Sequence, residues 1–296
     1  MWLIAAFALA GGLAQLVDGT LGMGFGVTSA TVLLAMGIAP ATASAATHAA
    51  KLPTTLVSGL SHWRAGNIDR AVLLRVALPG AIGGFLGAVV LTSISLAAAK
   101  GAMAGLLLFF GAVILARFGF GLRIIPVPRS GHTARWLVPI GLLGGFVDAT
   151  GGGGWGPVVT PSLMTVTRHE PRKVVGTTNA AEFAVAVSVS IGFFTGAAHQ
   201  DIPWLPVIGL VLGGVAVAPY AARLAGKLPH APMGAMVGGL IILVNSVAVL
   251  GTVADLPLWL DLSLLVGWIS VVAQIAWRAW HRERVASTEQ LVVDPA

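Results

Sequence analysis

The chain has 296 residues, of which 56% are hydrophobic and only 9% charged, with 17 Lys and Arg against 11 Asp and Glu. An ordinary soluble domain carries roughly 25% charged residues, so these side chains cannot cover a soluble surface of this size. The composition therefore excludes a cytosolic globular enzyme, a disordered protein and a nucleic-acid-binding protein. The net charge of +6 fits the Lys and Arg bias of membrane-protein loops. No cysteine is present, which excludes disulfides and thiolate metal sites.

Apolar runs follow one another along the chain and predict an all-α integral membrane protein. A spanning helix needs about 20 residues, and seven runs reach that length: 42–61, 71–92, 97–116, 173–196, 203–221, 231–251 and 257–277. Four shorter runs form two pairs around glycine-rich turns, 2–17 with 27–36 and 135–149 with 156–166. Such pairs in two halves of a chain are typical of re-entrant or broken helical hairpins. A cleaved signal peptide is the alternative for 1–17, although no Lys or Arg precedes this apolar stretch.

The two glycine-rich turns belong to an internal repeat. Residues 17–26 and 147–156 share Val, Asp, Thr and three Gly at an offset of 130 positions. Later matches keep the same order: Thr47 with Thr178, Asp69 with Asp201, and Met103 with Met236. This order predicts a duplication within a single membrane domain. Its parts are a first repeat over 1–119, a basic linker over 120–134, a second repeat over 135–251, an extra transmembrane helix over 257–280 and a polar, disordered tail over 281–296.

The distribution of Lys and Arg predicts the orientation of the chain. These residues concentrate in 62–75, 117–135, 167–173, 222–230 and the C-terminus, whereas the other connections hold only Lys100. Placing the basic loops in the cytoplasm puts the N-terminus outside and the C-terminus inside a cell inner membrane. Each half is then one glycine-containing hairpin plus three transmembrane helices. An odd number of crossings inverts the second half relative to the first.

The second glycine cluster fits the pattern G-x-G-x-x-G through Gly151, Gly153 and Gly156, but no strand precedes it, so no dinucleotide cofactor is expected. Glycine-rich backbone at mid-membrane is tolerated where it is buried in protein or lines a wet cavity. A helix is expected to begin after each cluster, near Val27 and near Pro157, and the free N–H groups of a helix N-terminus suit an anion. The expected anion-binding turns contain Gly24, Phe25, Gly26, Gly154, Trp155 and Gly156. The alternative is that these glycines only permit close helix packing, as is expected for Gly80, Gly83, Gly84 and Gly87.

Four charged side chains lie inside apolar runs: Asp18, Lys51, Asp148 and Glu182. Each costs about 2.5–3.5 kcal/mol on insertion scales, which favours a functional role for each. Helical spacing places Thr47 and His48 on the face of Lys51, and it places Thr178 and Asn179 on the face of Glu182. This arrangement predicts a substrate site made of Thr47, His48, Lys51, Thr178 and Asn179. Glu182, Asp18 and Asp148 are expected to carry a coupling proton.

Structural alternatives for the same residues stay open. Lys51 and Glu182 occupy matching positions of the two repeats, so they could form a buried ion pair that only holds the halves together. Asp18 and Asp148 could only cap the glycine turns. The polar stretch 58–69, including His62, is interpreted as a turn at the membrane interface. The remaining histidines lack metal-ligand spacing, and no metal or other cofactor is expected.

Several motifs together resemble the sulfite exporter TauE/SafE family of membrane permeases. They are the turn 22–26, Gly-Ile-Ala-Pro-Ala-x-Ala at 37–43, Ala-Thr-x-x-x-Lys-Leu at 46–52, Ser-x-x-x-x-Gly-x-Ile-Asp at 61–69, and second copies at 151–157 and 170–179. The resemblance covers about residues 5–250. It implies an all-helical fold with inverted halves, and transport of small, often sulfur-containing anions such as sulfite, sulfonates or sulfoacetate, or organic acids in some members. The first turn lacks the proline that follows the second, so the two hairpins are expected to contribute unequally.

The predicted function is secondary transport of sulfite, a sulfonate or a related organosulfur anion, by alternating access at a midplane site in the bilayer. A proton is the expected coupling ion, because Asp18, Asp148, Glu182 and His48 are titratable. An uncoupled anion channel, a membrane-embedded enzyme and a structural subunit are the alternatives. An enzyme would need a nucleophile–base pair or a metal cluster, and the sequence has no such spacing.

Overall fold

The computed structural model describes residues 2–122, 133–167, 169–195, 202–250 and 258–293, and all regular elements within these ranges are helices. The first half contains α1 (Trp2–Leu21), α2 (Phe25–Ala35), α3 (Pro40–Arg64), α4 (Arg70–Ser93), α5 (Leu96–Ile114) and the short π-helix η1 (Leu115–Gly119). The second half contains α6 (Thr133–Gly151), α7 (Trp155–Val166), α8 (Pro171–Thr195), α9 (Trp204–Leu224), α10 (His230–Leu250) and α11 (Leu258–Val293).

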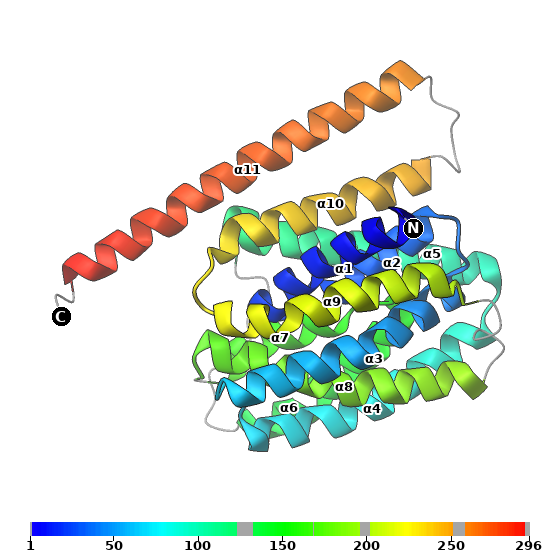
Figure 1. The fold of residues 1–296 in the computed structure, drawn as a ribbon, viewed down its shortest axis with the longest axis horizontal. Helices are drawn as coiled ribbons and strands as arrows, with labels where there is room; N and C mark the ends of the chain where they lie inside the picture. The colour runs from blue at the N-terminus through cyan, green and yellow to red at the C-terminus, as the bar shows by residue number, and fades with distance from the viewer. Residues whose placement is uncertain (1, 123–132, 168, 196–201, 251–257, 294–296) are drawn as a thin grey trace.

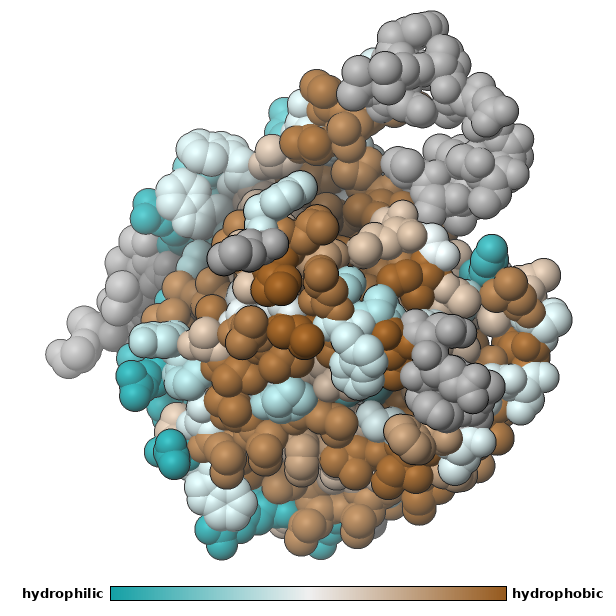
Figure 2. All heavy atoms as spheres, turned by 45° about the vertical axis from the view of Figure 1, so that its right-hand side comes forward, coloured by the Kyte–Doolittle hydropathy of each residue, from teal (hydrophilic) through white to brown (hydrophobic). Residues whose placement is uncertain are grey.

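Six of the described helical segments are long and apolar enough to cross a membrane, which confirms the predicted class of an all-helical integral membrane protein. They are Trp2–Leu21, Arg70–Ser93, Leu96–Gly119, Pro171–Thr195, Trp204–Leu224 and Ser263–Val285. Helix α3 also has 25 residues, but many of its buried positions are Ser, Thr, His or Lys, which lowers its hydropathy. Figure 2 shows hydrophobic side chains over much of one face of the molecule. Such a surface is suited to lipid.

The helices run roughly side by side, and the start of α1 and the C-terminal end of α11 lie on opposite sides of the molecule (Figure 1). Helix α1 packs along α9, α4 packs along α6, and α3 and α8 pack on each other between these pairs. Glycines permit the close pairs: a Cβ added to Gly213 would lie 1.7 Å from the Ala8 carbonyl oxygen, and one added to Gly83 would lie 2.0 Å from that of Leu142. The predicted packing role of Gly83 and its α4 neighbours is therefore confirmed.

Helix ends differ from the sequence prediction in three places. Helix α1 continues to Leu21 rather than 17, and within this last turn the hydroxyl of Thr20 bonds back to the carbonyls of Leu16 and Val17. Helices α2 and α7 begin two residues earlier than predicted, so Pro157 is the third residue of α7. The N–H groups of the first helical turn have no partner within the helix, so proline at this position costs no hydrogen bond. Helix α11 continues to Val293, where a disordered tail was expected, because 281–293 contains few helix-breaking residues. Most of the predicted linker and Asp201 lie outside the described residues.

Candidate functional site

The two glycine turns meet inside the protein. Gly22 and Gly152 have φ values of +72° and +73°, a conformation that favours glycine. A Cβ added to Gly153 would lie 2.0 Å from the backbone nitrogen of Val27, and one added to Gly156 would lie 2.5 Å from the Cα of Met23. The backbones of the turns therefore touch, which brings the N-termini of α2 and α7 together. These glycines therefore permit close packing, and the helix N-termini lie next to each other.

A carboxylate caps each of these N-termini. The backbone N–H of Trp155 donates to Asp148 Oδ1 at 3.0 Å, and the N–H of Phe25 donates to Asp18 Oδ1 at 3.3 Å. Each bond satisfies one of the N–H groups that a helix start leaves free. The predicted capping role of both aspartates is thus confirmed as a contact. It also means that a carboxylate already accepts the first N–H that sequence reasoning assigned to an anion.

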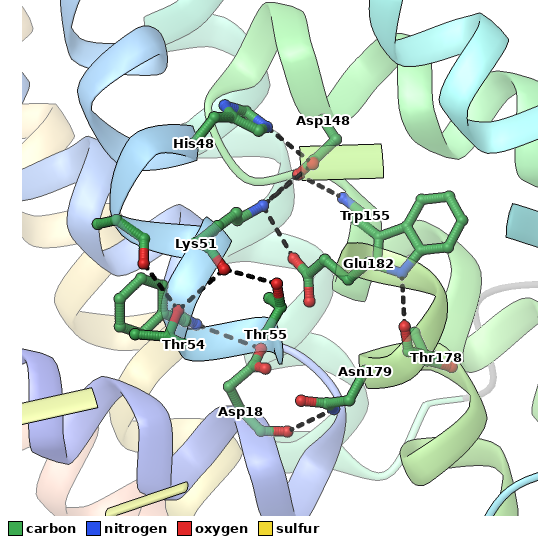
Figure 3. A network of polar contacts seen from close by, with 12 residues as sticks. Asp18, His48, Lys51, Thr54, Thr55, Asp148, Trp155, Thr178, Asn179 and Glu182 are labelled. Atoms are coloured by element: carbon green, nitrogen blue, oxygen red, sulfur yellow. Dashed lines mark hydrogen bonds and ion pairs between the residues drawn. The ribbon is translucent and has the colours of Figure 1, made fainter. Parts of the chain in front are cut away.

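Asp148 is the centre of a buried charged cluster (Figure 3). Lys51 Nζ lies 2.8 Å from Asp148 Oδ1 and 3.0 Å from Oδ2, and His48 Nε2 lies 3.0 Å from Oδ2. Lys51 Nζ also lies 2.9 Å from Glu182 Oε1, so the predicted pair of Lys51 and Glu182 forms. The four side chains come from α3, α6 and α8, and none is more than 5% exposed. Two side chains of α3 and the N-terminus of α7 therefore converge on the Asp148 carboxylate.

Lys51 has close backbone as well as close charges around it. A Cβ added to Gly26 would lie 2.7 Å from Lys51 Nζ, so the first turn of α2 lies against the ammonium group. Within the helix, the hydroxyl of Thr55 donates to the Lys51 carbonyl at 2.5 Å. The backbone carbonyl of Lys51 is thus bonded within its own helix, and its ammonium group faces the N-termini of α2 and α7.

The other predicted substrate residues bond elsewhere. The Asn179 amide donates to the backbone carbonyl of Asp18 at 3.3 Å and accepts from the Ser58 hydroxyl at 2.8 Å, so Asn179 links α1, α3 and α8. The Thr178 hydroxyl donates within α8 to the Val174 carbonyl. The Thr47 hydroxyl is buried and has no hydrogen-bond partner among the described residues. The structure therefore brings His48, Lys51 and the Trp155 N–H together and leaves Thr178 and Asn179 in supporting contacts.

Sequence analysis missed that the polar residues of α3 form one continuous buried stripe. Its members are Ser44, His48, Lys51, Thr55, Ser58 and His62, and each is 3% exposed or less. Their alternating spacing of four and three residues keeps them on one helix face and was visible in the sequence. His62, which was assigned to a turn at the membrane interface, lies in the last turn of α3 and is fully buried beside Asn67.

Comparisons with known proteins identify the family of the chain. The family model described as "Sulfite exporter TauE/SafE" matches residues 7–248. The chain is 46% identical over 246 residues to "Probable membrane transporter protein YtnM" of Bacillus subtilis (strain 168), a match that covers 82% of this chain and 81% of that protein. It is 27% identical over 177 residues to "Probable membrane transporter protein YdhB" of the same organism, covering 60% of this chain and 71% of that protein. No solved structure matches.

Proposed function

The chain belongs to the sulfite exporter TauE/SafE family and is a membrane transporter, and on that premise we propose that it carries a small anion by proton-coupled alternating access. The proposed substrate is sulfite, a sulfonate or a related organosulfur anion. The family name supports this chemical class. The proposed location is the inner membrane, with the N-terminus outside and the C-terminus in the cytoplasm.

The single observation that carries the proposal is the position of Lys51. Its ammonium group is 1% exposed, lies within 3.0 Å of two carboxylates and faces the N-termini of two short helices. An ammonium group together with helix N-terminal N–H groups is a donor set that suits an oxyanion. Because a buried ionisable residue in a membrane segment is energetically costly, such a residue is a candidate for a functional site.

The same cluster supports a midplane site between two inverted repeats. Lys51 follows the first residue of the 25-residue α3 by 11 positions, and Glu182 follows the first residue of the 25-residue α8 by the same number. Both therefore lie near the middle of a membrane-length helix. The short α2 and α7 begin at this level after matching turns. In the proposed arrangement the hairpins α1–α2 and α6–α7 enter from opposite faces, and the substrate binds between them.

Charge balance supports coupling to protons. Asp18, Asp148 and Glu182 interact electrostatically with one another around a single Lys51. Three negative charges beside one lysine are costly in the low-dielectric interior, and an anionic substrate adds another. We propose that the anion competes with one of these carboxylates for Lys51 and that the displaced carboxylate then gains a proton to avoid an unpaired buried charge. Anion and proton then bind together, which is the thermodynamic requirement for symport.

The test uses the full chain purified and reconstituted in liposomes, with uptake of sulfite and of small sulfonates measured under an imposed pH gradient. Wild-type protein should accumulate at least one of these anions above its equilibrium level. An uncoupled channel would only equilibrate the anion with the membrane potential, so this measurement separates the two alternatives.

The Lys51→Met variant should fold and lose anion affinity by about tenfold or more, because a buried donor with a full charge is removed. Lys100→Met is the matched control, since Lys100 is an exposed residue at the start of α5. Unchanged anion binding in a well-folded Lys51→Met protein would assign Lys51 a purely structural role.

A further inference from the structure

We infer that Asp148 is a built-in competitor of the substrate: its carboxylate holds the donors that the transported oxyanion needs, so the anion binds by displacing Asp148. This inference rests on the proposed transport of an anion and adds which group the anion replaces. It also assigns the protein one such site rather than one in each repeat.

The contacts of Asp148 are those of a bound anion. Its two oxygens accept from Lys51 Nζ at 2.8 and 3.0 Å, and Oδ1 also accepts from the Trp155 N–H at 3.0 Å. His48 Nε2 lies 3.0 Å from Oδ2. A cation, an imidazole and a helix N-terminus thus surround one carboxylate that is fully buried. These are the donor types predicted for the substrate, and Asp148 shares all three with it, whereas Glu182 shares only Lys51.

The matching aspartate of the first repeat lacks this arrangement. Asp18 accepts from the Phe25 N–H at 3.3 Å, and among the described residues no cation lies within ion-pair distance of its side chain. The difference arises because α3 presents His48 and Lys51 to Asp148, while α8 has Asn179 and Glu182 at the matching positions. Asn179 bonds to the backbone carbonyl of Asp18 instead of its carboxylate. The duplication has therefore produced one carboxylate with a full donor set and one that only caps a helix.

The contact between His48 and Asp148 contains an exchangeable proton. His48 Nδ1 lies 2.8 Å from the Ser44 carbonyl, which can only accept, so Nδ1 carries a hydrogen. A hydrogen bond between Nε2 and Oδ2 then requires one more proton, carried either by the imidazole or by the carboxyl group. When the anion takes the donors, the proton shared by Nε2 and Oδ2 stays on the imidazole, and the Asp148 carboxylate binds one further proton from solution and becomes a neutral carboxyl group. The total charge of the cluster is then unchanged.

The charged and titratable groups that face Asp148 are His48 and Lys51 from α3, Glu182 from α8 and Asp18 from α1. Neither Glu182 nor Asp18 can stabilise a displaced, charged Asp148, because the carboxylates all have the same sign. Lys51 is the single lysine or arginine in this set, and the anion occupies it. Proton uptake by Asp148 is therefore the way in which the site accepts an added negative charge.

The experiment measures methanesulfonate binding to the purified full chain by calorimetry between pH 5.5 and 8, because this sulfonate does not itself titrate in that range. Wild type should bind more tightly as the pH falls. Titrations in buffers of different ionisation enthalpy should show uptake of close to one proton per anion bound. Binding without proton uptake would overturn the inference.

Two variants separate Asp148 from its repeat counterpart. Asp148→Asn should bind methanesulfonate about tenfold or more tightly at pH 8, since a competing negative charge at contact distance is gone, and it should lose most of the pH dependence. Asp148→Ser serves as a second variant, because its hydroxyl oxygen can still accept from the Trp155 N–H. Asp18→Asn is the control and should keep the wild-type pH dependence.

The results separate the displacement of Asp148 from the proposed transport of an anion. If wild type neither binds nor transports sulfite or any sulfonate, the proposed function is wrong and the inference is wrong with it. If wild type binds with proton uptake but the Asp148 variants behave like Asp18→Asn, the proposed function stands and the inference is wrong.

Discussion

Lys51 contacts two carboxylates, so it keeps one ion-pair partner when the other is displaced. It bonds to both oxygens of Asp148 and to one oxygen of Glu182. Removing the only partner of a buried charge is strongly destabilising, by about 3–5 kcal/mol. A second carboxylate lowers this cost, because Lys51 keeps one ion pair when the other is exchanged for a substrate anion. A purely structural pair between the halves would not need this third charged group.

At the residue scale we predict that Glu182→Gln still binds, exchanges and accumulates the anion. The amide can still accept from Lys51, and Asp148 remains as the group that binds the proton. Loss of pH-gradient-driven accumulation with exchange retained would assign the proton to Glu182 instead. The measurement compares counterflow exchange with uphill uptake in the same liposomes.

A Glu182→Gln protein that concentrates substrate as well as wild type does would refute the coupling role of Glu182. Asp18 and Asp148, each replaced by Asn, would then be compared in the same uptake assay.

At the scale of elements, the site exists because two turns can touch. The N-termini of α2 and α7 meet only because the turns before them carry glycine at the contact, and α3 then passes Lys51 alongside. The polar stripe of α3 faces this junction along its length, from Ser44 near one end to His62 near the other. Helix α3 can be less apolar than its neighbours because its polar face is turned into the protein and away from lipid.

We predict that Gly153→Ala destabilises the protein by about 1–3 kcal/mol, the usual cost of overpacking. The added Cβ would lie 2.0 Å from the Val27 nitrogen and 2.2 Å from the Gly26 carbonyl carbon, both backbone atoms that cannot move aside alone. Thermal unfolding in detergent, followed by tryptophan fluorescence, measures the change.

Gly101→Ala is the matched control for this prediction, since a Cβ there meets no atom within 4 Å. The control should unfold at or slightly above the wild-type temperature, because alanine favours a helix over glycine. Equal unfolding temperatures for the two variants would contradict the backbone contact between the turns.

At the scale of the whole molecule, many apolar side chains face outward, while the charged cluster around Asp148 is enclosed. Leu74, Leu78, Ile82 and Phe109 are each about 60% exposed, while Lys51 and Asp148 are at most 1% exposed. In water this arrangement would be unstable, and in a bilayer it is the expected one, since lipid solvates the exterior. The start of α1 and the C-terminal end of α11 lie on opposite sides (Figure 1), as the proposed orientation requires.

We predict that a cysteine placed at Ser95, between α4 and α5, is labelled from outside intact cells by a membrane-impermeant thiol reagent. A cysteine placed at Arg223, at the end of α9, should be labelled only after the membrane is opened. The chain has no native cysteine, so each variant carries a single reactive thiol. Cytoplasmic labelling at Ser95 would contradict the proposed inverted topology.

The sequence by itself determined the class of protein and the composition of its charged centre. Long apolar runs predict membrane helices because hydropathy is a local property, and the few charges within these runs identify the residues that the interior has to pair. The predictions that Asp18 and Asp148 cap the turns and that Lys51 contacts Glu182 needed only repeat positions and helical spacing. The burial of His62 could also have been predicted from the alternating spacing of polar residues on α3.

Only the tertiary structure decided which carboxylate lies at the centre of the site. Asp18 and Asp148 occupy matching sequence positions, yet only Asp148 lies beside His48 and Lys51, because α3 crosses the end of α6 at that level. The crossing is set by close glycine contacts between helices distant in the chain, and it has no local signature. Contacts of this kind depend on the packing of several elements at once, which is why two aspartates at matching positions of the repeat have different surroundings in the folded chain.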